Sequence, residues 1–294
     1  TSEEQFRVEF ECDFIGSVNT LITPSKVRCL AYKEPLMKSS DGVKIYEKAQ
    51  PDRIYTMCVD ISRGQGIDYH AFTVVDVTEI PYKVVATFKN NELAPMVLPN
   101  LLYRVLREYN EAYCLIEIND IGGQVADILN FELEYENILY TSNKVGRGQE
   151  LSSGFGSKSS KLGIKTTASV KRKGCSLLKS MVEDDKLLIN DYDTIEELST
   201  FVSKRGSYEA DTGHHDDLAM TLVLFGWLTS QSYFRDISDV DIRKDLFQDR
   251  IDSVEESLTP FGFIDTGEED TDNIEIDSDG NVWFHDEDDD RIMW

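Results

Sequence analysis

Residues 55–70, with the sequence YTMCVDISRGQGIDYH, decide the fold and hold the first indication of function. The apolar run that ends at Val59 predicts a strand, the two glycines predict a turn, and a second apolar run over 71–77 predicts the returning strand. The first strand ends in the carboxylate of Asp60, where the pattern requires a core residue. Burial of an unpaired carboxylate costs several kcal/mol, so we expect other groups to compensate for its charge.

Strands and helices alternate along the central part of the chain. Three strands are predicted at about 54–60, 70–78 and 83–89, and their short connections make them an antiparallel meander. Helices are predicted from Leu98, from Gly122, around 175–183, over 194–202 and over 218–228, with further strands at 113–118, near 138–140 and at 187–189. The pattern indicates an α/β domain whose first three strands are antiparallel.

The two ends of the chain differ in composition from this central part. Residues 1–52 contain many turn formers, and we interpret them as a linker or the end of a preceding domain, with no core element. Residues 53–232 form the predicted domain. Residues 233–294 are predicted to be an acidic tail, because from Asp265 onward 13 acids accompany a single base. Such a composition favours weak order.

Composition limits the class of protein. The 294 residues carry a formal net charge of -25, which by itself argues against a nucleic-acid partner, since phosphate binding needs a basic surface. No apolar run approaches the roughly 18 residues that span a bilayer, so no membrane partner is expected. The five cysteines form no CxxC pair and are odd in number, which is typical of free thiols in a reducing compartment and not of a zinc site.

Three acids occupy positions where the local pattern requires an apolar residue. Asp60 and Glu117 lie in apolar strands, and Asp217 opens an apolar helix. Taken separately, Asp216 and Asp217 could cap the helix, and an acid in a strand could face water. Converging carboxylates, however, repel one another unless cations lie between them. Oxygen ligands without Cys or His suit Mg²⁺ or Mn²⁺, and two such ions about 4 Å apart catalyse phosphodiester hydrolysis. The sequence therefore predicts a two-metal nuclease.

Four further side chains are candidates for auxiliary roles. Asp68 follows the first turn and is either an additional metal ligand or a residue that stabilises the turn. His70 begins the returning strand, next to the same turn. His214 and His215 precede the last apolar helix. They either contact the scissile phosphate or shuttle protons, or they pack against and cap the start of the helix. The residues alone leave these alternatives open.

A basic segment, residues 142–174, interrupts the acidic chain. It contains one acid, Glu150, and many glycines and serines. Flexible cationic loops can follow a DNA backbone without reading its sequence, although a solvated linker has the same composition. The predicted DNA-binding residues are Lys144, Arg147, Lys158, Lys161, Lys165, Lys171, Arg172 and Lys173.

Five short stretches of this sequence resemble one protein family. They are VDISRGQGIDYH (59–70), LIEIN (115–119), GCSLLK (174–179), HDDLAM (215–220) and FGWL (225–228). Together they resemble the nuclease domain of the large terminase subunit of tailed bacteriophages, and most closely that of T4-like phages. The likeness extends from about Asp52 to Ser230.

This resemblance implies an RNase H-like fold, in which helices flank a mixed sheet. It implies that Asp60, Glu117 and Asp217 are the catalytic metal ligands, with Asp216 and Asp68 close to them. It also implies cleavage of double-stranded phage DNA in the cytoplasm of the infected host. The implied partners are the portal, the small terminase subunit and the protein's own ATPase domain, which would precede the first segment of this chain. The residues also permit a non-catalytic RNase H-like interaction module or a nuclease related to junction resolvases.

Overall fold

The computed structural model describes residues 20–62, 69–144, 148–152, 160–204, 206–238, 274–276 and 282–284. The chain divides into two compact units, Thr1–Lys244 and Asp245–Trp294. The described part of the second unit is an antiparallel hairpin of β13 (Ile274–Ile276) and β14 (Val282–Phe284). Within these described ranges, no helix has the length and apolar character needed to cross a membrane.

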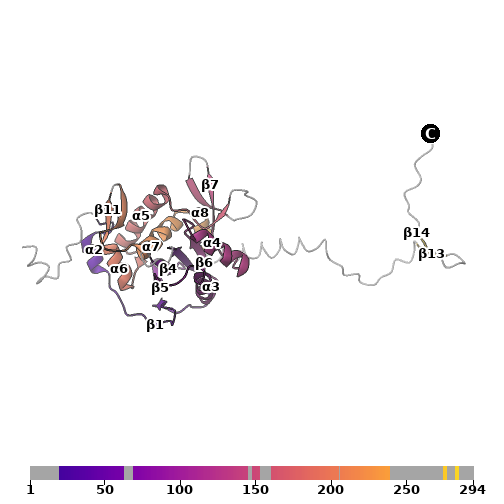
Figure 1. Ribbon diagram of the computed structural model, residues 1–294, viewed down its shortest axis with the longest axis horizontal. Helices are drawn as coiled ribbons and strands as arrows, with labels where there is room; N and C mark the ends of the chain where they lie inside the picture. The colour runs from indigo at the N-terminus through magenta and orange to yellow at the C-terminus, as the bar shows by residue number, and fades with distance from the viewer. Residues whose placement is uncertain are drawn as a thin grey trace, which may run out of the picture. The chain divides into compact units, whose positions relative to one another are not determined.

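A mixed sheet forms the centre of the first unit (Figure 1). Its strands are β1 (Met37–Lys38), β2 (Lys44–Ile45), β3 (Tyr55–Asp60), β4 (His70–Asp76), β5 (Tyr82–Asn90), β6 (Tyr113–Ile116) and β10 (Leu187–Leu188). Their order is β1-β2-β5-β4-β3-β6, and β10 pairs in parallel with the start of β5. β3, β4 and β5 pair antiparallel and β6 lies parallel to β3, which confirms the predicted meander.

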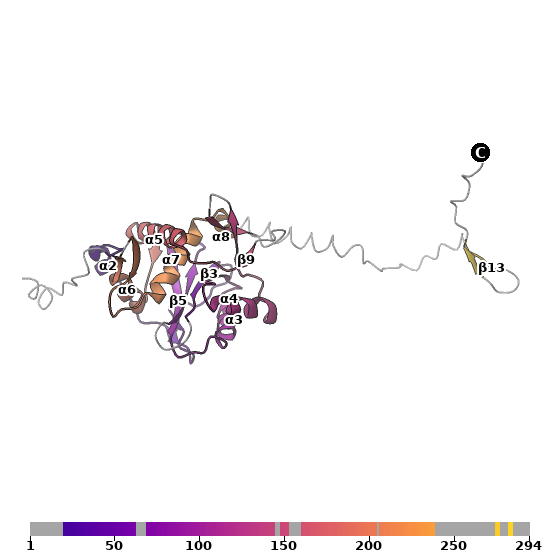
Figure 2. The ribbon, with the colours of Figure 1, turned by 45° about the horizontal axis from the view of Figure 1, so that its top comes forward.

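Helices cover both faces of this sheet (Figure 2). They are α2 (Pro24–Cys29), α3 (Leu98–Glu108), α4 (Gly122–Asp127), the π-helix η1 (Ile128–Glu132) that continues it, α5 (Ala168–Glu183), α6 (Tyr192–Ser199), α7 (Asp217–Thr229) and α8 (Ser232–Ser238). Thr167 caps α5 and Asp191 caps α6, because each side chain accepts a hydrogen bond from the backbone of the first turn. The helices α5, α6 and α7 pack on one face, and α3 and α4 pack on the other.

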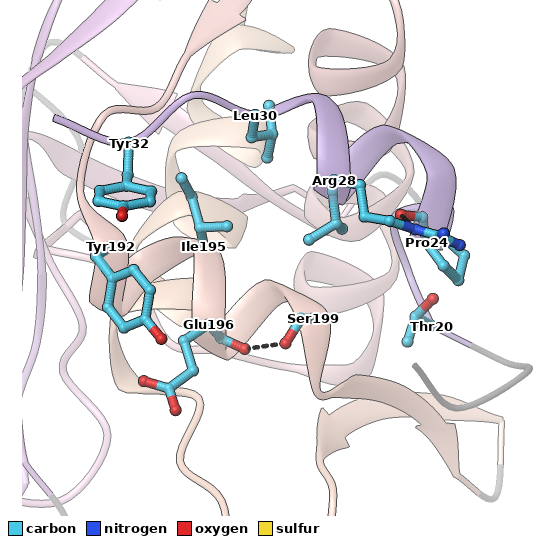
Figure 3. A pocket seen from close by; sticks show the side chains of 10 residues that line it. Thr20, Pro24, Arg28, Leu30, Tyr32, Tyr192, Ile195, Glu196 and Ser199 are labelled. Carbon is cyan, nitrogen blue, oxygen red and sulfur yellow. Dashed lines mark hydrogen bonds between the residues drawn. The ribbon is translucent and has the colours of Figure 1, made fainter. Parts of the chain in front are cut away.

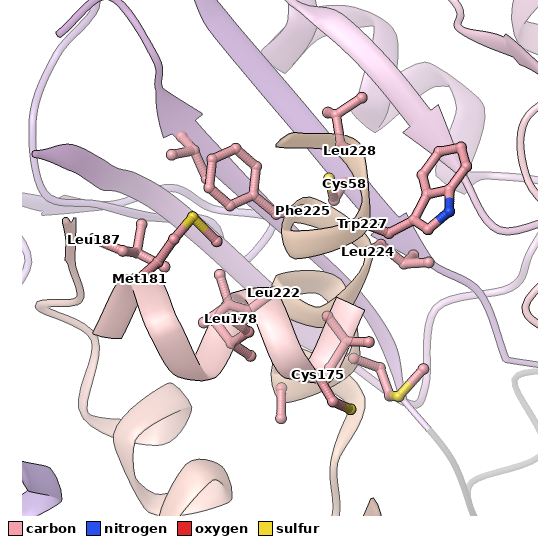
Figure 4. Close-up of a cluster of buried hydrophobic side chains, with 14 of the residues drawn as sticks. Cys58, Cys175, Leu178, Met181, Leu187, Leu222, Leu224, Phe225, Trp227 and Leu228 are labelled. Atoms are coloured by element: carbon pink, nitrogen blue, oxygen red, sulfur yellow. The ribbon is translucent and has the colours of Figure 1, made fainter. Parts of the chain in front are cut away.

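Strand alternation divides the apolar side chains into two cores. In β3, Met57 and Val59 belong to the core beside α3 and α4, whereas Cys58 belongs to the core beside α5 and α7. Figure 4 shows α7 crossing this second core, with Cys58 on the sheet side and α5 packed against it. Every residue of α7 from Asp217 to Leu228 is buried, as expected of a helix that is apolar on all sides.

A close crossing of two helices sets the position of α7. A Cβ atom on Gly174 of α5 would lie 2.2 Å from the carbonyl oxygen of Val223, and one on Gly226 of α7 would lie 2.5 Å from the carbonyl oxygen of Gly174. The two helices therefore touch backbone to backbone at these glycines. Because α7 is enclosed between α5 and the sheet, its first turn has little freedom to move.

The expectation that residues 1–52 contribute no core element is wrong for the part that the structure describes. Leu21 and Ile22 are buried in the core beside α7, and β2 pairs with β5. Two-residue strands and an isolated apolar pair are too short to show a period, so this contribution has no sequence signal.

Three other segments differ from their predictions. The helix predicted around 175–183 begins earlier, at Ala168. The prediction missed these first turns because they carry Lys and Arg instead of a row of apolar residues. Phe201 and Val202, expected at the end of a helix, lie in β11 (Phe201–Lys204), which pairs with β12 (Ser207–Ala210). Part of the segment predicted to be a cationic loop forms a sheet of β7 (Tyr140–Lys144), β8 (Gly148–Ser152) and β9 (Lys161–Leu162).

Candidate active site

Four residues lie in a row across the ends of neighbouring strands: Glu117, Asp60, Ala71 and Lys89. Three of them are charged, and we call this set the charged row. Asp60 ends β3 and pairs with Ala71 of β4, which pairs in turn with Lys89 of β5. On the other side of β3, the backbone N–H of Glu117 donates to the carbonyl of Val59 over 2.9 Å. Directly paired residues point to the same face, and the alternation along β3 turns this row toward α7.

Asp217 approaches the charged row from the first turn of α7. One helical turn further along, the hydroxyl of Thr221 lies 2.6 Å from that of Thr73 in β4, and this buried contact orients the start of the helix. The Asp217 Oδ1 atom accepts a hydrogen bond from the backbone N–H of Tyr69 at 3.0 Å. Its Oδ2 atom is buried and has no hydrogen-bond partner among the described residues.

The surroundings raise the pKa of two of these carboxyl groups. Burial raises the pKa of Asp60 well above its ordinary 3.8, and the charge of Glu117, a hydrogen bond to Glu117 and the charge of Asp217 add to this effect. Burial also raises the pKa of Asp217, although the N–H of Tyr69 and the charge of Lys89 oppose the shift. In both groups burial is the largest cause of the shift, and the charges of neighbouring acids add to it.

Two contacts fix the position of Glu117: close backbone packing against Gly122 and a hydrogen bond from the side chain of Asn119. A Cβ atom on Gly122, the first residue of α4, would lie 1.8 Å from the carbonyl oxygen of Glu117, so this helix starts against the end of the strand. The side-chain amide of Asn119 donates to Glu117 Oε1 at 2.8 Å. Asn119 is not among the predicted site residues, and its place two residues after a predicted ligand is the signal that could have found it.

A second charged pair lies beside Asp217. The Lys89 Nζ atom is 2.5 Å from Glu197 Oε1 and 3.8 Å from Asp217 Oδ2. Glu197 comes from α6 and is 4% exposed, and its other oxygen accepts the backbone N–H of Ala219 at 2.9 Å. Burial raises the pKa of Glu197 to about 7, because desolvation outweighs the attraction of Lys89. Neither Lys89 nor Glu197 is among the predicted site residues, since neither interrupts its local pattern.

The donor set of the acids fits a hard divalent cation. Carboxylate oxygens are the ligands that Mg²⁺ and Mn²⁺ prefer, and Asp217 Oδ2 is a buried oxygen without a hydrogen bond. The ligand geometry is incomplete: within the described ranges, no group of three or more His, Cys, Asp or Glu side chains is arranged to hold a metal ion.

The remaining predicted ligands and His70 have different surroundings. Asp216 occupies the N-cap position of α7, but its Oδ2 accepts the N–H of Ala210 at 3.2 Å instead of an N–H of its own helix. His70 is fully buried, its Nε2 lies 2.9 Å from the carbonyl oxygen of Leu93, and burial lowers its pKa. These are the contacts of a core residue, although the buried Nδ1 has no hydrogen-bond partner among the described residues, and the auxiliary role of His70 stays a prediction. Asp68 lies outside the described residues.

His214 and His215 line a cavity of about 430 Å³ together with Lys89 and Glu197. The His215 Nδ1 atom lies 3.9 Å from Asp217 Oδ2, and its ring meets that of Tyr69 edge-on at 4.9 Å between centroids. The backbone N–H of His214 donates to the carbonyl of Asp211. His215 is therefore the predicted histidine with a described contact to the acids.

Two of the predicted DNA-binding residues lie close to the acids. Lys161 and Lys165 line a cavity of about 340 Å³ together with Asn119, the residue that holds Glu117. Lys173 lines a second cavity, of about 480 Å³, between the start of α5, β8 and the end of α7. These three lysines surround the N-terminus of α5, because Thr167 lines both cavities.

The other predicted basic residues do not join this group. Lys171 and Arg172 line a cavity of about 260 Å³ with residues of β12, and Lys171 Nζ lies 5.7 Å from the centre of the Phe201 ring. Arg147 and Lys158 lie outside the described residues, and only the backbone of Lys144 is described. The structure thus divides a segment that the sequence presents as one basic block.

An apolar pocket of about 190 Å³ lies between α2 and α6 (Figure 3). Tyr32 and Tyr192 stand beside each other at one end, with ring centroids 5.4 Å apart. Asp60, Glu117 and Asp217 are absent from its lining. The pocket therefore contributes nothing to the acidic site.

Comparison with known proteins places this geometry in a family. A family model for the terminase RNase H-like domain matches residues 57–225. Two solved structures of the large terminase nuclease from thermophilic phage G20c, one with bound magnesium and one with bound cobalt, are each 19% identical to this chain, with a TM-score of 0.54, over 71% of this chain and 97% of theirs. The large terminase nuclease domain of Thermus phage P74-26 is 20% identical, with a TM-score of 0.51, over 70% of this chain and 93% of that one.

The structural likeness confirms the expected RNase H-like fold, and the family model extends over more than half of the chain. The matched residues run from β3 to α7 and so contain the whole charged row and Asp217. The chain belongs to the family of terminase RNase H-like domains.

Proposed function

We propose that this domain is a divalent-metal-dependent endonuclease that cuts double-stranded phage DNA during genome packaging, in the infected host. The observation that supports it best is the convergence of Asp60, Glu117 and Asp217 on one face of the sheet, with raised pKa values and a buried Asp217 oxygen that has no hydrogen bond. The magnesium-bound and cobalt-bound nucleases of phage G20c are consistent with this proposal.

Each acid has a distinct place in the proposed reaction. Asp60 would hold both cations because it interacts with both other acids, whereas Glu117 and Asp217 would each hold one. When bound, the cations would supply an activated water and stabilise the leaving oxygen. The chain itself orients the carboxylates, through the amide of Asn119 on Glu117 and the backbone N–H of Tyr69 on Asp217.

The basic residues beside this site suit a DNA backbone. Lys161 and Lys165 share a cavity with Asn119, whose amide holds Glu117. Contacts of lysine with phosphate carry no sequence information, so we propose cleavage with little sequence preference. In the full-length protein we propose that an ATPase domain, the portal and the small terminase subunit are the partners.

Plasmid cleavage tests the proposal. We expect nicking and linearisation in Mg²⁺ or Mn²⁺ and none in EDTA. Asp60→Asn should lower the rate at least about a thousandfold, equivalent to about 4 kcal/mol of transition-state stabilisation. Asp52→Asn, at an exposed acid outside the site, is the matched control and should cut like the wild type. Wild-type cleavage by a folded Asp60→Asn variant would sink the proposal.

A non-catalytic interaction module is the competing function, and the incomplete ligand geometry favours it. A wild-type protein that produces no metal-dependent nicking would support the module. A junction resolvase-like nuclease is separated by competition, since a four-way junction should then displace linear duplex from the enzyme. We expect linear duplex to compete equally well.

A further inference from the structure

We infer that Lys89 and Glu197 form a positioning pair that holds the Asp217 carboxylate in the orientation required for metal binding. The inference rests on the proposed function, because it concerns how one of the proposed ligands is held. Lys89 and Glu197 are 108 residues apart in the chain, and the fold brings them together beside the first turn of α7.

Glu197 connects three elements. It belongs to α6, one of its oxygens accepts a hydrogen bond from Lys89 of β5 at 2.5 Å, and the other accepts the backbone N–H of Ala219 in α7 at 2.9 Å. The first N–H groups of a helix have no partner within the helix, and here a side chain from another helix supplies one. The first turn of α7 is thereby anchored to the sheet at Ala219, two residues after Asp217.

Lys89 contacts Asp217 directly at one carboxylate oxygen and through Tyr69 at the other. Its Nζ lies 3.8 Å from Asp217 Oδ2, the oxygen without a hydrogen bond. The same Nζ lies 4.4 Å from the centre of the Tyr69 ring, and the backbone N–H of Tyr69 donates to Asp217 Oδ1. Lys89, Tyr69, Asp217, Ala219 and Glu197 therefore form a closed set of contacts around one carboxylate.

Stability alone does not explain this pair. The side chains of Lys89 and Glu197 are only 17% and 5% exposed. Replacing a buried ion pair by well-packed neutral residues is often neutral or stabilising, because desolvation offsets the attraction between the charges. The contacts of the pair with the start of α7 and with Asp217 instead point to a role in geometry.

The test is the double variant Lys89→Met with Glu197→Gln, which removes both partners of the pair at once and leaves neither charge unpaired. Mn²⁺ binding is measured by calorimetry without DNA. We expect the affinity to fall about tenfold, which is typical when a group that orients a metal ligand is lost. The Mn²⁺ concentration that gives half-maximal cleavage should rise by the same factor. Lys89→Arg keeps the charge and should stay close to the wild type.

The matched control is an ion pair at the other end of the central strands. Arg53, just before β3, pairs with the buried Asp76 at the end of β4, at 2.9 Å. The double variant Arg53→Met with Asp76→Asn removes a comparable pair away from the acids, and its Mn²⁺ affinity should remain within about twofold of the wild type. Equal losses in both double variants would overturn the inference, because they would show a general loss of packing.

The result also separates the inference from the proposed function. If the Lys89 and Glu197 double variant binds Mn²⁺ normally while Asp60→Asn does not, the inference is overturned and the proposed function stands. If Asp60→Asn binds Mn²⁺ like the wild type, the proposed function fails. Should circular dichroism show the double variant unfolded, Glu197→Gln alone, which retains a single acceptor oxygen, replaces it, and unchanged Mn²⁺ affinity then overturns the inference.

Discussion

Two carboxylates at the ends of secondary-structure elements in this domain have opposite surroundings. Asp191, the N-cap of α6, is 0% exposed, receives hydrogen bonds from Thr194 and Tyr46, and pairs with Lys44 at 3.1 Å. Burial alone would raise its pKa, but the hydrogen bonds and the charge of Lys44 lower it. Asp60 faces other acids, and its pKa is raised.

This difference separates a carboxylate whose oxygens are satisfied within the fold from one whose surroundings suit the proposed site. Where donors satisfy each oxygen, as in Asp191, the ionised group stabilises the fold and requires nothing from solvent. Where acids converge and burial raises the pKa, as at Asp60, ionisation costs stability, and such groups are typical of sites that bind a ligand or perform chemistry. The comparison predicts opposite responses when either aspartate is replaced by asparagine.

Asp191→Asn should have the largest effect on stability. The change weakens the pair with Lys44 and puts an amide N–H₂ where an acceptor is needed, so we expect a loss of about 2–3 kcal/mol in the free energy of unfolding. Urea unfolding at pH 7 measures it. Mn²⁺ affinity should not change, and a variant as stable as the wild type would remove the structural half of the comparison.

The pH dependence of this difference follows from the lowered pKa of Asp191. A carboxyl group with a lowered pKa in the folded state stabilises the protein above its unfolded pKa, near 3.8, and loses this contribution as the pH falls through the folded value. The stability gap between the wild type and Asp191→Asn should therefore be constant near neutral pH and shrink below about pH 3.8. A gap that widens with acid would contradict the assignment.

Asp60→Asn should have a smaller effect of opposite sign. In EDTA, removing one charge from the converging acids should stabilise the domain by about 1 kcal/mol, or about 2–4 °C in melting temperature. Mg²⁺ should raise the melting temperature of the wild type but not of the variant, since ligand binding stabilises only a protein that binds it. A lower melting temperature in EDTA would show that Asp60 is a structural carboxylate like Asp191.

The smallest effect is expected at the lysines beside the site. Lys161→Gln and Lys165→Gln should each reduce the slope of log affinity for duplex DNA against log salt by about 1, as for the loss of one phosphate contact. Arg172→Gln, in the cavity shared with β12, is the matched control and should leave the slope unchanged. Fluorescence anisotropy over a salt series measures this, and equal slopes for all four proteins would exclude Lys161 and Lys165 from the DNA path.

The meander and the unusual positions of the three acids could be predicted from the sequence because their signals are local. Asp60 and Glu117 interrupt apolar strands, and a two-residue period shows such an interruption within a few positions. Asp217 is visible for the same reason, at the start of a uniformly apolar helix. The contribution of Leu21 and Ile22 to the core could not be predicted, because the partner segments are distant in the chain.

By itself, the sequence determined the α/β class and showed which acids interrupt the apolar pattern, since both depend on short-range periodicity. Only the tertiary structure decided which charges surround them. The strand register aligns Lys89 with Ala71 and Asp60, and the packing of α6 against α7 brings Glu197 to the same place. It also separated Lys171 and Arg172 from the lysines near the acids. Strand register and helix packing join segments that are distant in the chain and leave no local pattern in the sequence. Only the folded structure therefore shows these contacts.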